Sequence, residues 1–243
     1  MAKRFVSNDD LSARMFRSDV LEKFTKVHPA APHVIFLPVI GYMLYASTKG
    51  VSLGTTALLF LAGLAIWSFT EYIMHRFVFH VPTRVQEEVH RRVEAVGPEG
   101  PTLPALEGFQ QLRYFIAHGV HHDFPNDSRR LVMPPSVSIP LAFLFYFLFA
   151  AVFGSINTPA LFAGLVLGYL VYDTTHYAIH HFPMRTRIGR YLKRHHFRHH
   201  YLDSTKDYGV SSPVWDAAFR TLGAGAVAHQ DAGEREPAGS PTP

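Results

Sequence analysis

A long stretch without charge sets the first limit on how this chain of 243 residues can fold. From residue 131 to residue 172, 42 consecutive positions contain no Asp, Glu, Lys or Arg. One helical pass through a bilayer needs about 20 apolar residues, so this stretch is long enough for two passes. The sequence Gly-Ser-Ile-Asn-Thr-Pro at 154–159 provides a turn between them. We therefore predict a membrane hairpin with helices at 136–153 and 159–173.

A second apolar pair lies nearer the N-terminus. Residues 33–47 and 51–70 are apolar, with a short polar interruption that contains Lys49. Charged residues make up 17% of the chain, below the roughly 25% of a typical soluble domain. A soluble protein with two buried helical hairpins is the alternative. The sequence favours an all-α membrane protein with four transmembrane helices in two hairpins.

Basic residues predict the orientation of these helices. Seven Lys and Arg residues lie between the two apolar pairs, eight lie between residues 173 and 220, and six precede the first pair, whereas Lys49 is alone in the short turns. Cytoplasmic segments carry such an excess, so both termini and a helical cap made of 71–135 and 174–222 are predicted to be cytoplasmic. We expect no signal peptide, because the first apolar run starts only near His33. A net charge of +4 without a basic block argues against a nucleic-acid partner.

The two ends of the chain have their own patterns. Residues 1–32 are predicted to be an amphipathic segment, in which Ser7, Asn8 and Asp9 cap a helix that begins near Asp10. Its apolar side chains share one face, which fits either a helix on the membrane surface or a helix packed against the cap. These apolar residues are Phe16, Val20, Phe24 and Val27. Residues 223–243 are rich in Ala, Gly, Pro and Glu and are predicted to be disordered.

Histidine is the compositional outlier, with 16 copies, and most of them lie in four short motifs. The motifs are H-x4-H from His75, H-x2-H-H from His118, H-x3-H-H from His176 and H-H-x2-H-H from His195. Neutral imidazole binds iron, copper, nickel and zinc. Since the chain has no cysteine, histidine is the only plausible metal-binding shell.

Helical geometry separates the inward histidines from the others. At about 100° per residue, the three histidines of H-x2-H-H share one side of a helix, and so do two histidines four residues apart. By the same arithmetic His181 and His195 point away, as outer or surface residues. His75 and His80 differ by about 140°, so the helix is expected to loosen just before Pro82. Ten ligands suit two metal ions with about five each, close to the membrane surface.

The order of the four motifs resembles the fatty acid hydroxylase / sterol desaturase superfamily of membrane di-iron enzymes, and in particular its fatty acid 2-hydroxylase branch. The segments that carry the resemblance are 71–80 (EYIMHRFVFH), 118–122 (HGVHH), 127–135 (DSRRLVMPP), 172–180 (YDTTHYAIH), 192–200 (LKRHHFRHH), 208–212 (YGVSS) and Trp215-Asp216. Carried over position by position, the resemblance implies the metal ligands His75, His80, His118, His121, His122, His176, His180, His196, His199 and His200.

The resemblance also implies a cap over four membrane helices in a hydroxylase domain that spans 33–222. It implies two iron ions, replaceable by zinc in a purified protein, with O2 as co-substrate and a lipid acyl chain as substrate. Relatives often carry a fused haem-binding domain, which this chain has no room for, so we expect a separate electron-donor protein. Hydroxylation at C2 of a fatty acid is the predicted reaction.

Several alternatives and secondary features stay open at this stage. A sterol or carotenoid oxygenase or desaturase of the same superfamily is the nearest alternative. A non-redox zinc membrane protein is disfavoured because no H-E-x-x-H motif is present. Glu71 and Asp173 lie four and three residues before His75 and His176, so they are either carboxylates that orient these ligands or helix-end charges. The segment 83–110 is longer than the superfamily leads us to expect; an inert surface insertion is favoured over a part of the substrate entrance or a partner site.

Overall fold

Helices account for all the regular secondary structure of residues 5–224, the part of the chain that this computed structural model describes. The long helices are α2 (Ala31–Gly50), α3 (Leu53–Ile73), α7 (Pro135–Phe153) and α8 (Thr158–His181). The shorter helices are α1 (Asp19–Phe24), α4 (Thr83–Val96), α5 (Gly108–Tyr114), α6 (Val120–Asp123), α9 (Arg187–Tyr201) and α10 (Val214–Ala218). Two π-helical turns, η1 (Met74–Phe79) and η3 (Phe115–Gly119), and a 3-10 turn, η2 (Leu103–Ala105), complete the set.

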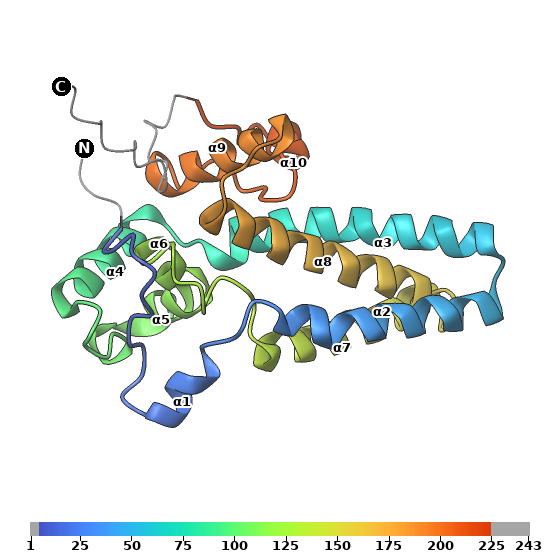
Figure 1. Cartoon of the computed structure of the whole chain (residues 1–243), viewed down its shortest axis with the longest axis horizontal. Coiled ribbons are helices and arrows are strands. Elements are labelled where there is room, and N and C mark those ends of the chain that lie inside the picture. Colours follow the sequence, from blue (N-terminus) through green and yellow to red (C-terminus); the bar gives the residue numbers. More distant parts are fainter. Residues whose placement is uncertain (1–4, 225–243) are drawn as a thin grey trace, which may run out of the picture.

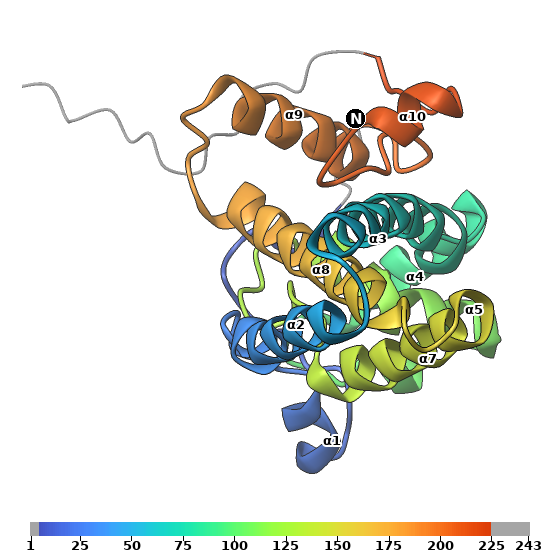
Figure 2. The ribbon, with the colours of Figure 1, turned by 90° about the vertical axis from the view of Figure 1, so that its right-hand side faces the viewer.

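The four long helices form two hairpins, α2–α3 and α7–α8, that extend together from one side of the molecule (Figure 1). Their turns lie side by side, since a Cβ placed on Gly50 would be 2.9 Å from the side chain of Ile156. Seen along the bundle in Figure 2, α8 lies between α2 and α3. Phe36, Trp67 and Tyr169 join these three helices in the main apolar core.

Three helices are long and apolar enough to cross a membrane: Ala31–Gly50, Leu53–Phe79 and Pro135–Phe153. Only 11–22% of the residues in these spans are buried inside the structure, as expected for helices surrounded by lipid. The fourth predicted span is part of α8, most of which is buried among the other helices. This helix also runs past the predicted end at residue 173 and continues to His181.

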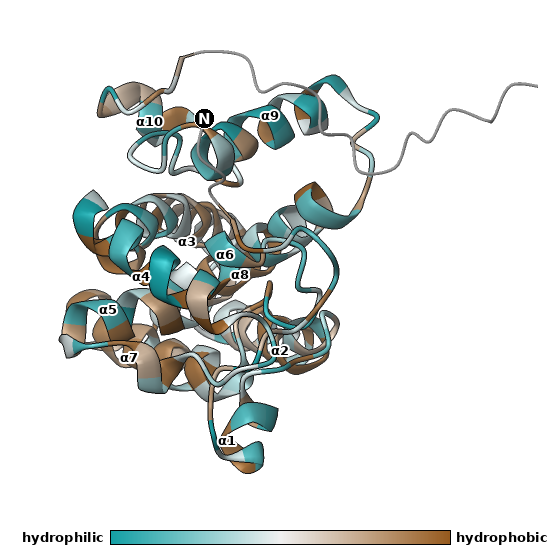
Figure 3. Cartoon of the chain, turned by 90° about the vertical axis from the view of Figure 1, so that its left-hand side faces the viewer, coloured by the Kyte–Doolittle hydropathy of each residue, from teal (hydrophilic) through white to brown (hydrophobic). Residues whose placement is uncertain are grey.

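The other end of the bundle carries a cap built from α4, α5, α6 and α9 (Figure 1). Its outer helices α4 and α9 are largely hydrophilic in Figure 3, in contrast to the brown surface along α7. The segment 83–110 belongs to the core of this cap, since Val89 and Val93 of α4 are fully buried. His90 of the same helix bonds through Nδ1 to Asp123 at 2.5 Å. The segment is therefore not the surface insertion that the sequence favoured.

The predicted N-terminal helix from Asp10 is wrong. The structure has no helix between residue 5 and α1, which begins after Ser18. Backbone groups that would form the helix bond to the cap instead, with the N–H of Arg14 donating to the carbonyl of Pro98 at 2.9 Å. Met15 is buried in the apolar core of the cap. Tertiary contacts therefore decide this segment, as in the cap-packing alternative. The predicted disordered tail lies outside the described residues from position 225 onward.

Candidate metal centre

Two π-helical turns adjust the helix ends that carry the first two histidine motifs. At the end of α3, the N–H of His80 donates to the carbonyl of His75 at 3.3 Å, which closes a turn of five residues. Side chains five residues apart can then point the same way, which a regular α-helix does not allow. The departure from α-geometry lies where the sequence placed it, before Pro82. His118 is part of the second such turn, η3.

The structure brings all ten predicted ligands together in two clusters of five buried histidines. The ligand nitrogens within each cluster lie within 4.8 Å of one another. The first histidine group contains His75, His80, His118, His122 and His199, and the second contains His121, His176, His180, His196 and His200. Neighbours in sequence, such as His121 and His122, thus belong to different groups. Both groups lie where the ends of α3 and α8 meet the cap.

Nitrogen spacing in the groups fits ligands around a metal ion. In the second group, Nε2 of His176 lies 2.9 Å from Nε2 of His121 and 3.1 Å from Nε2 of His196. In the first group, the Nε2 atoms of His80 and His199 are 2.9 Å apart. Two nitrogens bound at right angles to one ion, at about 2.1 Å each, are about 3.0 Å apart. Three nitrogens that face one another cannot all be paired by shared protons, so the donor set fits a cation.

The protonation state of the cap histidines also fits metal binding. Burial, with the charges of neighbouring histidines, lowers the pKa of His118, His121 and His196 well below its usual value. Burial likewise lowers the pKa of His199 to about 4. These rings are therefore neutral near pH 7, with a nitrogen lone pair free for a metal.

His195 lies outside both groups and is fully buried. Its ring bonds on both sides to carboxylates, with Nδ1 3.1 Å from Asp207 and Nε2 3.1 Å from Asp216. Burial opposes protonation, but these hydrogen bonds raise the pKa of His195 above its usual value. The prediction that His195 is an outer residue and not a ligand agrees with the geometry. The alternative prediction, that it lies on the surface, does not. His181, the other histidine predicted to point away, is in neither group and is partly buried.

The two carboxylates expected to orient ligands do not touch an imidazole. Glu71 accepts hydrogen bonds from the backbone N–H groups of Val210 and Ser211 at 2.7 and 2.9 Å. Asp173 is buried one turn before His176, and none of the described imidazoles lies within hydrogen-bonding distance of it. Backbone carbonyls of Lys206 and Tyr208 bond to His199 and His75 instead. The sequence does not reveal these two partners, because every residue has a backbone carbonyl whatever its type.

A buried, all-histidine double cluster at the base of apolar helices defines a candidate metal centre in a membrane protein. The profile of the family described as fatty acid hydroxylase matches residues 106–221. The dihydroceramide fatty acyl 2-hydroxylase FAH1 of Arabidopsis thaliana is 34% identical over 86% of this chain and 79% of its own length. The ceramide very long chain fatty acid hydroxylase scs7 of Schizosaccharomyces pombe is 35% identical over 87% of this chain and 55% of its own length.

A solved structure has the same fold. It is of full-length scs7p, with only the hydroxylase domain visible, and it superposes with a TM-score of 0.72 at 33% identity over 88% of this chain and 73% of that one. The chain therefore belongs to the fatty acid hydroxylase family.

Proposed function

We propose that this chain is an iron-dependent, O2-using hydroxylase that acts at C2 of a fatty acyl chain. The observation that carries the proposal is the pair of five-histidine groups at the ends of apolar helices, in a chain whose relatives are named fatty acyl 2-hydroxylases. The ten histidines are the proposed ligands of two iron ions, five to each ion. Imidazole sites also accept zinc, so zinc can occupy them in purified protein.

The bound metal supplies the redox chemistry that side chains lack. With two electrons and two protons, one oxygen atom of O2 enters a C–H bond and the other leaves as water. A separate electron-donor protein is the proposed source of the electrons. The chain itself holds the ligands, positions the lipid and excludes water. C2 of an acyl chain lies beside its carbonyl, close to the lipid head group, and so at the depth where the bundle meets the cap.

A narrow apolar cavity between the long helices is the proposed acyl-chain site. Phe36 of α2, Trp67 of α3, Phe145 of α7 and Tyr169 of α8 line it together with Met133. Tyr169 precedes the ligand His176 by seven residues, or about 10 Å along the helix. An acyl chain in this cavity can therefore reach the second histidine group with its polar end.

The membrane arrangement is part of the proposal. We infer that α8 is a fourth membrane helix, enclosed by the three whose outer faces are apolar. The excess of Lys and Arg on the cap side supports a cytoplasmic location for the cap and both termini. Residues 33–222 form the hydroxylase unit in this scheme.

Lipid analysis tests this function directly. Cells that make no 2-hydroxy lipids should accumulate 2-hydroxy acyl chains when they express the protein, as measured by mass spectrometry with iron and O2 present. His121→Ala and His196→Ala should abolish the product at equal protein levels in the membrane. His28→Ala, which changes a histidine outside both groups, should leave it unchanged. A hydroxyl group at another carbon, or on a sterol, would show that the proposed substrate or its reacting carbon is wrong. The absence of any oxidised lipid would refute the proposal.

A further inference from the structure

We propose that Glu71 and Asp216 are positioning residues that orient His75 and His199 of the first histidine group. They act through residues 206–211, which we call the clasp loop. This inference rests on the metal binding proposed above and goes further, because it makes the two groups unequal. The first group depends on a loop held by two distant carboxylates, and the second does not.

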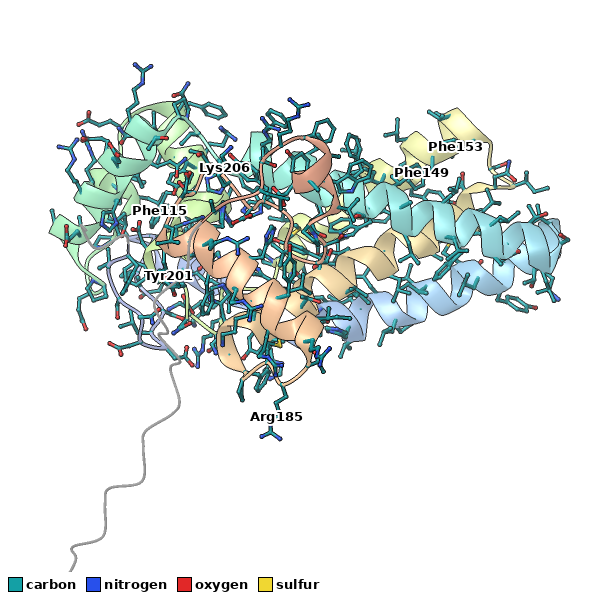
Figure 4. The ribbon with its side chains drawn as sticks, turned by 90° about the horizontal axis from the view of Figure 1, so that it is seen from above. Phe115, Phe149, Phe153, Arg185, Tyr201 and Lys206 are labelled. Atoms are coloured by element: carbon teal, nitrogen blue, oxygen red, sulfur yellow. The ribbon has the colours of Figure 1, made fainter. Side chains whose placement is uncertain are left out.

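The clasp loop supplies the backbone acceptors for two ligands. Nδ1 of His199 donates to the carbonyl of Lys206 at 2.6 Å, and Nδ1 of His75 donates to the carbonyl of Tyr208. A proton held on Nδ1 leaves Nε2 with its lone pair, and the hydrogen bond also fixes the rotation of the ring. Figure 4 shows Lys206 in the loop that follows Tyr201 at the end of α9. The loop thus connects a ligand on α9 with a ligand at the end of α3.

Four consecutive N–H groups of the clasp loop donate to only two carboxylates. Asp216 accepts from Tyr208 at 2.9 Å and from Gly209 at 2.7 Å. Glu71 accepts from Val210 and Ser211, and also from the Ser211 hydroxyl. Both carboxylates are buried, at 0% and 4% exposure. The loop has no regular secondary structure, so these bonds replace the missing helical or strand partners.

The arrangement leaves little freedom at the centre of the loop. A Cβ on Gly209 would lie 2.0 Å from the carbonyl oxygen of Ser212 and 3.0 Å from Oδ2 of Asp216. A carboxylate offers two acceptor oxygens, whereas an amide offers one oxygen and an NH2 group that is itself a donor. Asp216 accepts from Tyr208 and Gly209 on different oxygens, so Asp216→Asn sets a donor against a donor in a buried site. Both N–H groups that bond to Glu71 share one of its oxygens, so Glu71→Ala, which removes that oxygen, leaves both without their acceptor. The loop must shift, and its two carbonyls shift with it.

The second histidine group provides an internal comparison. Within residues 5–224, no hydrogen bond joins the clasp loop to an imidazole of that group; the rings of His121, His176, His180 and His196 contact one another. A change confined to the clasp loop should therefore weaken metal binding by the first histidine group and leave metal binding by the second unchanged. General loss of folding would weaken metal binding by both groups together.

Zinc release from the full-length chain in detergent tests this inference. The purified protein is loaded with zinc, its zinc content per chain is measured by mass spectrometry, and release to a colorimetric chelator is followed by absorbance. His118→Ala and His180→Ala assign the release phases, since each removes a ligand from one group only and neither ligand contacts the loop. Glu71→Ala and Asp216→Asn should accelerate release from the first group about 10- to 100-fold and leave the second phase unchanged.

The matched control is Glu22→Gln. Glu22 is also buried and also accepts from two consecutive N–H groups, those of Met15 and Phe16, but it holds a segment without metal ligands. The Glu22→Gln variant should release both zinc ions at wild-type rates. Unchanged release in Glu71→Ala and Asp216→Asn, or equal acceleration of both phases, would overturn the inference. A wild-type chain that binds fewer than two zinc ions would instead overturn the proposed metal centre on which the inference rests, and this is seen before any variant is made.

Discussion

The contact between α3 and α8 gives the sharpest test of how the bundle positions the histidines. The two helices touch backbone to backbone at Gly63 and Gly164. A Cβ on Gly164 would lie 2.0 Å from the carbonyl oxygen of Phe60, and a Cβ on Gly63 would lie 2.1 Å from that of Leu161. Real Cβ atoms essentially never come closer than 3.0 Å to another heavy atom. Gly164→Ala must therefore move the helices apart by about 1 Å, because no flexible side chain can give way.

This displacement should affect both stability and activity. Overpacking of a close contact costs about 1 to 3 kcal/mol, and a rigid backbone contact belongs at the upper end of that range. The end of α3 leads into His75, and α8 carries His176 and His180. A misplacement of about 1 Å at a reacting centre can cost on the order of 100-fold in rate. We therefore expect Gly164→Ala to lower the thermal transition temperature and to reduce hydroxylation about 100-fold.

Thermal unfolding of the purified protein and product formation per molecule measure the two effects separately. Gly41→Ala on α2 is the matched control, since a Cβ there meets nothing within 4 Å. It should be neutral or stabilise α2 by up to about 1 kcal/mol through helix propensity. Wild-type stability and turnover in Gly164→Ala would refute the reasoning, and so would equal damage from Gly41→Ala.

Three further predictions follow from single contacts and from the metal sites. Burial acts to raise the pKa of Glu22, but hydrogen bonds from Phe16 and Met15 and the charge of Arg130 lower it below 4.5. The ionised Glu22 therefore stabilises the fold fully above pH 4.5, and this stabilisation is lost as the pH falls. Glu22→Gln should flatten the acid side of a plot of transition temperature against pH. Ser47→Ala removes a buried hydrogen bond of 3.0 Å to Thr56 between α2 and α3 and should cost about 0.6 kcal/mol, with about 1.7 kcal/mol as the upper limit, in reversible unfolding. Removal of metal with a chelator should lower the transition temperature, and ferrous iron should restore it; equal temperatures with and without metal would contradict the assigned sites.

Facing arithmetic identifies the histidines that the structure gathers into two groups, because imidazoles that are to share an ion must share a side of their helix. It places three histidines of the 118–122 motif and three of α9 on inward faces, where the structure has them. The arithmetic fails for His75 and His80, since it assumes a regular α-helix and the segment is a π-turn. Pro82 predicted that the helix loosens here, but periodicity carries no information about the π-turn that it forms.

Hydrogen-bond partners that are distant in sequence are a second feature that the sequence does not predict. Glu71 lies four residues before a ligand and is a natural candidate to orient that ligand, yet its acceptors are used by Val210 and Ser211. Only the folded chain brings the two segments together. The predicted helix in the N-terminal segment is wrong for a related reason, because the local capping signals at Ser7–Asp9 compete with backbone hydrogen bonds to the cap.

The composition of the two histidine groups explains why the proposed centre lies where the bundle meets the cap. The first group takes His75 and His80 from the end of the α2–α3 hairpin, and the second takes His176 and His180 from the end of the α7–α8 hairpin. Each group completes its five nitrogens from the same two cap segments, 118–122 and α9. One ion in each group would therefore join one hairpin to the cap, and the cap would in turn join the two hairpins. With both proposed ions bound, metal binding and the packing of the bundle against its cap would thus be coupled, and the clasp loop would strengthen the attachment of the first hairpin only.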